Sequence, residues 1–521
     1  AHPSRAGPSH AVPLLRIAMK LLNDSDRVKR EVLARVARAL YAGAPATLDR
    51  IPLDMRPKGQ PFSRCCVYKD RAALRYRVMA ALGFREEDET DELKPLAAYA
   101  ADVPKRTRNP EPFISILSEG CSACLESQTT VTNLCRSCLA RPCVANCPKQ
   151  AVHIKNGRAE IDRAKCVNCG ICAKACSFHA IVQVPLACAD ACPVDAVGKT
   201  EDGRVAIDHD RCIRCGRCQS ACPFGAIMSC SQIADVILKI KAGRTVVALT
   251  APSLAGIFPN ETERLNGALH RLGFAAVYDV AAGADETARR EARELSDRIA
   301  VGEAFMTTSC CPAWVETARR HLPDLAKHLS HTPSPMRLTA EMARADHPDA
   351  VLVFIGPCAA KRTEATLAGI PDHVLTAEEL GAMLMAADID VEACESIASV
   401  RTGSPAGFGF AVGGGVAAAV AGQCPNGLTA KPYAVQGLSS KMIKLLATFA
   451  KTGKAPGPLV EVMCCEGGCV AGPGSFEDPA RAAVRLRASP LCRAAACDEA
   501  PRPPRAPEPP PPPPRQTAAT I

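Results

Sequence analysis

The chain has 521 residues, of which 47% are hydrophobic, and it contains 29 cysteines but a single tryptophan. This length accommodates two or three domains with sizeable cores. The formal net charge is +9 at pH 7, but lysines and arginines are dispersed and few aromatic residues accompany them, so we expect no nucleic-acid partner. The sequence holds no run of about eighteen apolar residues, so we expect no membrane-spanning segment.

The cysteines indicate a reducing compartment. A secreted disulfide scaffold would be short, whereas these cysteines occur in ordered CxxC spacings along a long chain, which is typical of metal ligation. The apolar stretch at residues 14–22 is interrupted by Arg16 and Lys20, so it does not resemble a secretory signal. We therefore expect a cytoplasmic protein.

Composition divides the chain into four regions. Residues 1–110 are rich in arginine and alanine and are predicted to form a helical N-terminal segment. Residues 111–232 include sixteen cysteines between Cys121 and Cys222, and residues 240–490 alternate β-rich runs with helical stretches, which predicts an α/β domain. Residues 498–521 are rich in proline and too poor in apolar residues to fold, so they are expected to form an extended tail.

The hydrophobic pattern also predicts individual elements. Apolar residues at helical spacing predict a helix over residues 27–40. In the α/β domain we predict strands at residues 245–249, 275–278 and 351–355, and helices at residues 284–300 and 314–329.

Two cysteine runs have the spacing of bacterial ferredoxins. The first comprises Cys166, Cys169, Cys172 and Cys176, and the second comprises Cys212, Cys215, Cys218 and Cys222. In such runs the first three thiolates wrap one [4Fe–4S] cube, while the fourth cysteine, beyond a three-residue gap, ligates a neighbouring cube. Residues 111–232 are therefore predicted to form an α+β ferredoxin-like domain, in which each run needs a fourth ligand from another segment.

Other cysteines supply those ligands. The simplest assignment has three sets: Cys147 with Cys166, Cys169 and Cys172; Cys176 with Cys135, Cys138 and Cys143; and Cys192 with Cys212, Cys215 and Cys218. Cys188 and Cys222 then remain, and Cys121 with Cys124 would complete a fourth set. The alternative is a zinc site in which Cys121 and Cys124 join Cys135 and Cys138. The sequence thus predicts three or four accessory clusters, which alone imply only electron transfer.

Three segments of the α/β domain carry further cysteines. They read TSCCP at residues 308–312, PCAAKRTE at residues 357–364 and EVMCCEGGC at residues 461–469. Each follows a β-type run or lies in a glycine-rich loop, where ligands of an α/β domain usually bind. These segments resemble, in the same chain order, the TSCCP, PCxxKxxE and ExMxCxxGC signatures of [FeFe]-hydrogenases.

The resemblance implies a catalytic domain with two lobes around a buried H-cluster, a [4Fe–4S] cube bridged to a di-iron subsite with CO, cyanide and a dithiolate. The cube would be held by Cys311, Cys358, Cys465 and Cys469, of which Cys469 would bridge to the subsite. Cys310 would pass protons to and from the subsite. Lys361 would hydrogen-bond a cyanide ligand, and Glu364 completes the second signature.

The resemblance also implies a proton path. Glu291, Glu294 and Arg298 lie at positions i, i+3 and i+7 of a predicted helix and so share one face. With Ser330 and Cys310 they match the relay of the family from solvent to the cluster. Their spacing alone fits an ordinary solvated helix face equally well, so this assignment depends on the motifs around it.

The implied activity is that of a ferredoxin hydrogenase, an iron–sulfur oxidoreductase that converts 2H+ and 2e− to H2 in either direction. Electrons would come from ferredoxin or a similar soluble carrier through the accessory clusters, which reach about −400 mV. Maturation enzymes would supply the di-iron subsite. Two alternatives stay open: a hydrogenase-like iron–sulfur assembly or carrier protein without that subsite, and a low-turnover H2 or redox sensor.

Some positions depart from the best-characterised members of the family and resemble a divergent, monomeric, ferredoxin-fused branch. Gly356 stands where methionine is common, and Cys464 replaces a small apolar residue. Cys464 would either lie beside the ligands or simply pack. Seven more cysteines fit no ligand pattern and are expected to be buried structural thiols: Cys65, Cys66, Cys230, Cys394, Cys424, Cys492 and Cys497.

Overall fold

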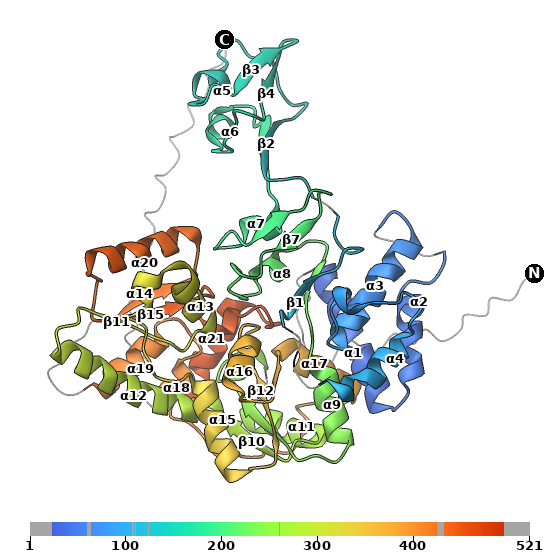
Figure 1. Cartoon of the computed structure of the whole chain (residues 1–521), viewed down its shortest axis with the longest axis vertical. Coiled ribbons are helices and arrows are strands. Elements are labelled where there is room, and N and C mark those ends of the chain that lie inside the picture. The colour runs from blue at the N-terminus through green and yellow to red at the C-terminus, as the bar shows by residue number, and fades with distance from the viewer. Residues whose placement is uncertain are drawn as a thin grey trace, which may run out of the picture.

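The computed structural model describes residues 23–59, 64–106, 109, 111–122, 124–259, 261–424 and 432–493. The predicted proline-rich tail and Cys497 lie outside the described residues. Figure 1 shows helices α1–α4 beside the α/β domain, and a cysteine-rich part that projects away from it.

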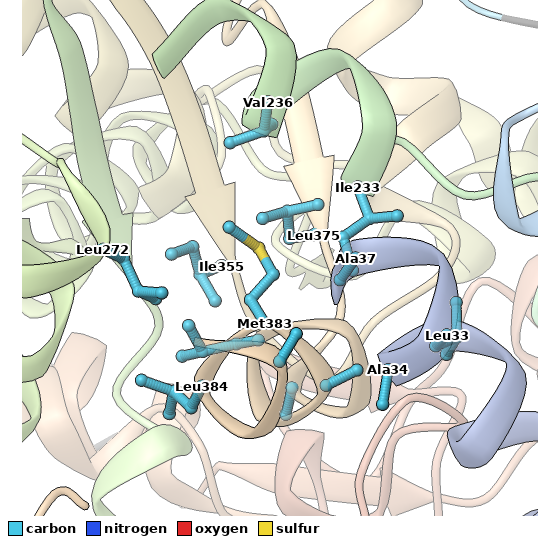
Figure 2. Packing of buried hydrophobic residues seen from close by; sticks show 14 of the residues in the cluster. Leu33, Ala34, Ala37, Ile233, Val236, Leu272, Ile355, Leu375, Met383 and Leu384 are labelled. Carbon is cyan, nitrogen blue, oxygen red and sulfur yellow. The ribbon is translucent and has the colours of Figure 1, made fainter. Parts of the chain in front are cut away.

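The N-terminal helices pack on the α/β domain. They are α1 (Asp24–Tyr41), α2 (Ile51–Met55), α3 (Val67–Ala81) and α4 (Leu96–Asp102). α1 covers the helix predicted over residues 27–40 and begins where Asn23 Oδ1 accepts the backbone N–H of Asp26 at 2.9 Å. Its apolar face packs on α9 (Ile233–Lys241) and α17 (Ala377–Ala386), and Figure 2 shows Leu33 and Ala37 of α1 in one apolar cluster with Met383 of α17.

A buried ion pair joins α1 to α17. Arg30 Nε lies 3.1 Å from a carboxylate oxygen of Glu378, and these side chains are only 3% and 4% exposed. Lys29 donates to the other oxygen of the same carboxylate. Removing one member of a buried pair is costly because the remaining charge stays out of water.

The cysteine-rich part is built from short antiparallel strand pairs. The pairs are β1 (Ile114–Ile116) with β8 (Ile227–Ser229), β2 (Gln128–Val131) with β5 (Ile181–Val184), β3 (Val152–Lys155) with β4 (Arg158–Ile161), and β6 (Val197–Lys199) with β7 (Val205–Ile207). Four one-turn helices accompany them: α5 (Pro142–Ala145), α6 (Ile171–Ala175), α7 (Ala187–Asp190) and α8 (Arg217–Ala221). Cysteines make up a large share of the two small cores here, so we infer that bound clusters contribute much of their stability.

The α/β domain contains two sheets, and every strand pair in them is parallel, which is typical of strands that alternate with helices. The larger has the order β10 (Ala276–Asp279), β9 (Val246–Thr250), β12 (Val351–Ile355), β13 (His373–Leu375), and the smaller has the order β11 (Met306–Thr307), β15 (Leu459–Met463), β14 (Tyr433–Gln436). All residues of β9, β12 and β15 are buried, which is typical of parallel strands covered on both faces. The three predicted strands are confirmed to within one residue.

Helices surround these sheets. They are α10 (Leu254–Ile257), α11 (Thr262–Leu272), α12 (Val280–Ala300), α13 (Pro312–His321), α14 (Pro323–Ala326), α15 (Pro335–Asp346), α16 (Lys361–Ala368), α18 (Pro405–Gly409), α19 (Gly415–Gln423), α20 (Ser440–Thr452), α21 (Pro479–Ala488) and α22 (Pro490–Arg493). The helix predicted at residues 284–300 is confirmed within α12. Within the described ranges, none of the helices has the length and apolar character needed to cross a membrane.

The helix predicted at residues 314–329 is interrupted: α13 ends at His321, the short helix α14 covers Pro323–Ala326, and residues 327–329 are not helical. Leu322 leaves the helical region with φ −136° and ψ 61°. Pro323 causes the break, because it disfavours helical geometry in the preceding residue and has no N–H to donate. The chain then reaches Leu329, which bridges to Thr307 at the edge of the smaller sheet.

Replacing Glu378 tests the α1–α17 contact. In Glu378→Ala the Arg30 guanidinium stays buried without this carboxylate, so we expect a loss of about 3–5 kcal/mol of stability. Thermal unfolding followed by circular dichroism should show a clearly lower midpoint, and a protease should cut the α1–α4 region earlier. The control is Glu341→Ala, which removes an exposed ion pair with Arg337 and should cost less than about 1 kcal/mol. Equal midpoints in the two variants would contradict the prediction.

Candidate functional site

The accessory cysteines gather in groups. Cys147, Cys166, Cys169 and Cys172 line one small cavity. The thiol of Cys143 lies close to those of Cys138 and Cys176, and Cys143 and Cys176 share one apolar cluster with Cys135. The thiols of Cys212 and Cys218 lie close to those of Cys215 and Cys192. These three groups contain the same cysteines as the three cluster sets assigned from the sequence.

Four further cysteines form a fourth group. The thiol of Cys124 lies close to those of Cys121 and Cys222, and the thiol of Cys188 lies close to Cys222 and Cys124. This grouping corresponds to the fourth cluster set and does not favour the zinc alternative. Among the described residues, no group of three or more His, Cys, Asp or Glu side chains is spaced to hold a single metal ion. An iron–sulfur cube keeps its thiolates farther apart than one ion does.

The order of these groups follows the arrangement of the helices. In Figure 1, α5 and α6 with β3 and β4 lie at the far end of the projecting part, while α7 and α8 lie between them and the α/β domain. Cys143 and Cys172 belong to the far end, and Cys188 and Cys218 belong to α7 and α8. The cysteine groups therefore form a line that leads to the α/β domain.

The three signature segments surround one cavity in the α/β domain. They follow β11, β12 and β15, so strand ends from both parallel sheets contribute to its wall. The space not filled by protein atoms, including the open mouth of the cavity, is about 860 Å³. Its wall includes Cys310, Cys311, Cys358, Lys361, Cys464, Cys465 and Cys469, and also Cys215 of the ferredoxin-like part.

Four of these thiols lie together. Cys465 is close enough to Cys358, Cys311 and Cys469 for their charges to interact directly. Cys311 is the residue before α13, and burial raises the pKa of its thiol, although its sulfur accepts the backbone N–H groups of Cys464 and Trp314. Gly468 lets the third segment lie close to the backbone of Gly413. With φ +96°, a Cβ at Gly468 would lie only 2.6 Å from the nitrogen of Gly413.

Lys361 places a buried positive charge in the cavity wall. Its ammonium donates to Glu364 Oε2 at 2.6 Å, to Ser334 Oγ at 3.0 Å and to the Cys310 carbonyl at 3.3 Å. Burial opposes the charged form, but the Glu364 carboxylate holds the pKa of Lys361 above its ordinary value. The sequence did not single out Ser334, which also donates to Glu364 and so fixes this ion pair.

Cys310 and Glu291 form the inner end of a polar chain. Cys310 is 8% exposed, and burial, with the nearby Glu291 carboxylate, raises the pKa of its thiol well above the usual value. Glu291 is fully buried, and this burial raises its pKa to about 7 despite hydrogen bonds from Ser309. The Ser309 N–H and hydroxyl reach Glu291 Oε1 at 3.2 and 3.3 Å. Ser309 precedes Cys310, which is the signal that could have identified it.

Glu294, Ser330 and Arg298 form the outer end. Ser330 interacts with Glu291 and donates to Glu294 Oε2 at 2.7 Å, so it stands between the two carboxylates. Burial alone would raise the pKa of Glu294, but hydrogen bonds from the His331 N–H, Ser330 and Arg298 hold it below its ordinary value. Arg298 Nη2 lies 2.7 Å from Glu294, and both residues line a surface depression. The structure thus brings all five predicted relay residues into one line that starts at the surface.

The buried carboxylate of Glu461 connects the third segment to α19. Its two oxygens accept the N–H groups of Gly414 and Ala417 at 2.8 Å each, at the start of that helix. Burial raises the pKa of Glu461. The start of α19 therefore lies directly beside the third signature.

The remaining cysteines follow the prediction in part. Cys230, Cys394 and Cys492 are buried, as expected, and Cys424 is half-buried. The expectation is wrong for Cys65, which is exposed, and for Cys66, which is only partly covered. They immediately precede α3, whose buried face begins later in the helix. Cys464 is buried and its thiol hydrogen-bonds that of Cys215.

Parts of the chain are similar to known proteins. Residues 244–473 match the family model of the iron-only hydrogenase large subunit, C-terminal domain. Residues 244–473 are therefore [FeFe]-hydrogenase-like. Residues 158–181 and 205–228 match models of 4Fe-4S binding domains, each of which includes cysteines of one ferredoxin run.

Curated relatives match part of the chain. The large subunit of the periplasmic [Fe] hydrogenase of Nitratidesulfovibrio vulgaris is 29% identical over 324 residues, covering 50% of this chain and 76% of that protein. Iron hydrogenase 1 of Clostridium pasteurianum is 29% identical over 265 residues, covering 41% of this chain and 45% of that protein. A structure of [FeFe]-hydrogenase HydA1 from Chlamydomonas reinhardtii has 22% identity and a TM-score of 0.41, covering 49% of this chain and 88% of that one.

The buried carboxyl of Glu291 should titrate near neutral pH. Because burial penalises its charged form, Glu291 should be protonated below about pH 7 and ionised above it. Infrared difference spectra should therefore show a carboxylic-acid band that fades as the pH rises through about 7 and is missing in Glu291→Gln. Glu294→Gln is the matched control, because the lowered pKa of Glu294 keeps it ionised in this range. A neutral-range band that survives Glu291→Gln would refute the assignment.

Proposed function

We propose that the chain is an [FeFe]-hydrogenase that interconverts 2H+ and 2e− with H2. The observation that carries the proposal is the convergence of Cys311, Cys358, Cys465 and Cys469 on one cavity, with Cys310 and Lys361 in the same wall. A family-model match over the same segments supports it. An electron-transfer protein alone would need neither the buried thiol nor the buried ammonium.

The four converging thiols fit a [4Fe–4S] cube. They are soft sulfur donors from three segments and face one enclosed space, which suits an iron–sulfur cluster rather than a hard cation. We infer that Cys469 would also hold a di-iron subsite carrying CO, cyanide and a dithiolate, and this subsite would supply the H2 chemistry. The ammonium of Lys361, held by Glu364, would stabilise an anionic ligand such as cyanide.

The polar chain from Cys310 to Arg298 is proposed to carry protons. Cys310 would exchange protons at the cavity, and its high pKa keeps the thiol protonated and able to donate. Glu291 is half-protonated near neutral pH, so it can both take and release a proton. Ser330 would pass the proton to Glu294, and Arg298 would hold Glu294 at the surface depression.

Electrons are proposed to travel along the accessory clusters. We assign ligands to four sets: Cys147, Cys166, Cys169 and Cys172; Cys135, Cys138, Cys143 and Cys176; Cys121, Cys124, Cys188 and Cys222; and Cys192, Cys212, Cys215 and Cys218. The donor would be ferredoxin or a similar soluble carrier, since a net charge of +9 favours an acidic partner. Maturation enzymes would supply the di-iron subsite. We also propose a cytoplasmic location, where thiols stay reduced before clusters are inserted.

The infrared spectrum of protein matured with a di-iron precursor tests this function. We expect bands of bound CO and cyanide, together with H2 evolution when a strong low-potential reductant is supplied. Matured protein without those bands would be an iron–sulfur assembly or carrier protein. Bands with negligible turnover in both directions would point to an H2 or redox sensor. Either result would overturn the enzyme assignment.

Replacing Cys310 should stop proton exchange while the cofactor remains. In Cys310→Ala the four cube thiols are intact, so the infrared bands should persist, whereas H2 turnover should fall by about 10²–10⁴-fold because the proton donor is lost. H2 production measured by gas chromatography gives the turnover. Cys424→Ala is the matched control, since this half-buried thiol donates only to the Val420 carbonyl. Unchanged turnover in Cys310→Ala would exclude the thiol from the relay.

Replacing Cys222 tests the fourth cluster set. Cys222→Ser should lower the iron and sulfide content by one [4Fe–4S] cluster, because serine is a poor ligand in that set. Iron analysis and low-temperature electron paramagnetic resonance (EPR) of the reduced protein measure the change. Cys230→Ser, which replaces a buried thiol outside the four sets, should leave the cluster content unchanged. Zinc bound at Cys121 and Cys124 without loss of iron would support the zinc alternative instead.

A further inference from the structure

Cys464 lies where the ferredoxin-like part meets the cavity of the α/β domain. The side chain is 2% exposed, and its thiol hydrogen-bonds the sulfur of Cys215. The backbone N–H of Cys464 hydrogen-bonds the sulfur of Cys311. The next residue in the chain is Cys465. One residue therefore contacts a sulfur from each of two neighbouring cysteine groups and is covalently joined to a second member of the cavity group.

The packing around Cys464 holds this contact in place. Gly216, next to Cys215, has φ +78°, and a Cβ there would lie 2.9 Å from Pro473 and 3.6 Å from the side chain of Ala359, which follows Cys358. The Leu438 N–H donates to the Cys464 carbonyl at 3.0 Å, and the Leu438 carbonyl accepts from the Arg217 guanidinium. The loop that carries Cys215 is thus attached on both sides to the segments around the cavity.

We propose that Cys464 is a positioning residue for electron transfer, whose thiol hydrogen-bonds the cluster held by Cys215 and links it to the cluster of the α/β cavity. The first cluster follows from the 4Fe-4S family match over residues 205–228, and the second rests on the proposed function. The electron moves singly from one cluster to the other, so the donor cluster is oxidised by one electron and the acceptor reduced by one. No covalent bond forms or breaks.

The direction of the hydrogen bond determines its effect. A ligand thiolate has no proton, so Cys464 is the donor and the iron-bound sulfur of Cys215 is the acceptor. A donor stabilises the more negative, reduced cluster, and hydrogen bonds to sulfur are one of the factors that set the potentials of such clusters. Cys464 should therefore make the Cys215 cluster easier to reduce than it would be beside an apolar side chain.

Cys464 also provides a direct route for the electron between the two clusters. From the sulfur of Cys215 the route crosses one hydrogen bond to the Cys464 thiol, follows the Cys464 backbone and enters Cys465 through a peptide bond. A second branch runs from the Cys464 N–H to the sulfur of Cys311. Both branches lie in buried protein, because Cys464 and Cys215 share an apolar cluster with Cys311 and Cys358.

An EPR-monitored redox titration tests the proposal in full-length protein that carries its [4Fe–4S] clusters but has not received the di-iron subsite. In Cys464→Ala the Cys215 cluster should have a lower midpoint potential, so that its ratio of reduced to oxidised form at a fixed potential falls by about fivefold, a typical effect of one lost hydrogen bond. Cys464→Ser keeps a donor at this position and should restore the ratio to within about twofold of the parent. The other clusters should titrate as in the parent protein.

The matched control is Cys394→Ala, which removes an equally buried thiol whose hydrogen bond goes to the Asp390 carbonyl. The proposal is overturned if Cys464→Ala titrates like Cys394→Ala, if Cys464→Ser fails to restore the potential, or if Cys464→Ala loses the Cys215 cluster altogether. This titration needs no H2 turnover. The titration can therefore support the role of Cys464 in a protein that binds no di-iron subsite, and it can refute that role in an active hydrogenase.

Discussion

The direction of parallel strands is the constraint on which this protein depends. β12 of the larger sheet and β11 and β15 of the smaller sheet all end at the wall of one cavity, and each continues into a segment that carries cysteine. A strand packed on both faces cannot shift its register without losing the close fit of its side chains to their neighbours, so each segment starts from a fixed point. Thiols separated by up to about 160 positions in the chain are thereby held within reach of one another.

Buried charge in the cavity is tolerated because every charged group has partners. Lys361, Glu364 and Ser334 form a compact set in which each polar atom is used, and Glu461 is satisfied by two backbone N–H groups of α19. Glu291 is the exception: one of its carboxylate oxygens has no partner among the described residues. Keeping that carboxyl neutral over part of the pH range removes the cost of a poorly solvated charge, and the same property allows it to exchange protons.

The parts of the chain are joined by different kinds of contact. The N-terminal helices pack through apolar side chains and through the Arg30–Glu378 ion pair, and so stabilise α17 behind the larger sheet. The ferredoxin-like part has small cores of its own, and it reaches the α/β domain through Cys215, Gly216 and Arg217. Electron transfer requires a short distance between the clusters, and Gly216 at this contact lets the two backbones approach each other.

The sequence by itself determined the features that local pattern encodes. Cysteine spacing identified the ferredoxin runs, hydrophobic runs gave the strands at β9, β10 and β12, and the three signatures named the residues that gather at the cavity. Pattern failed where one residue overrides its neighbours: Pro323 ended α13 early, and the position of Cys65 before α3 left it exposed. Only the tertiary structure decided that Ser309 and Ser330 contact Glu291, that Ser334 secures Lys361, and that Cys464 meets Cys215. Those contacts join residues far apart in the chain, and the packing of whole sheets and helices sets them, which no local spacing records.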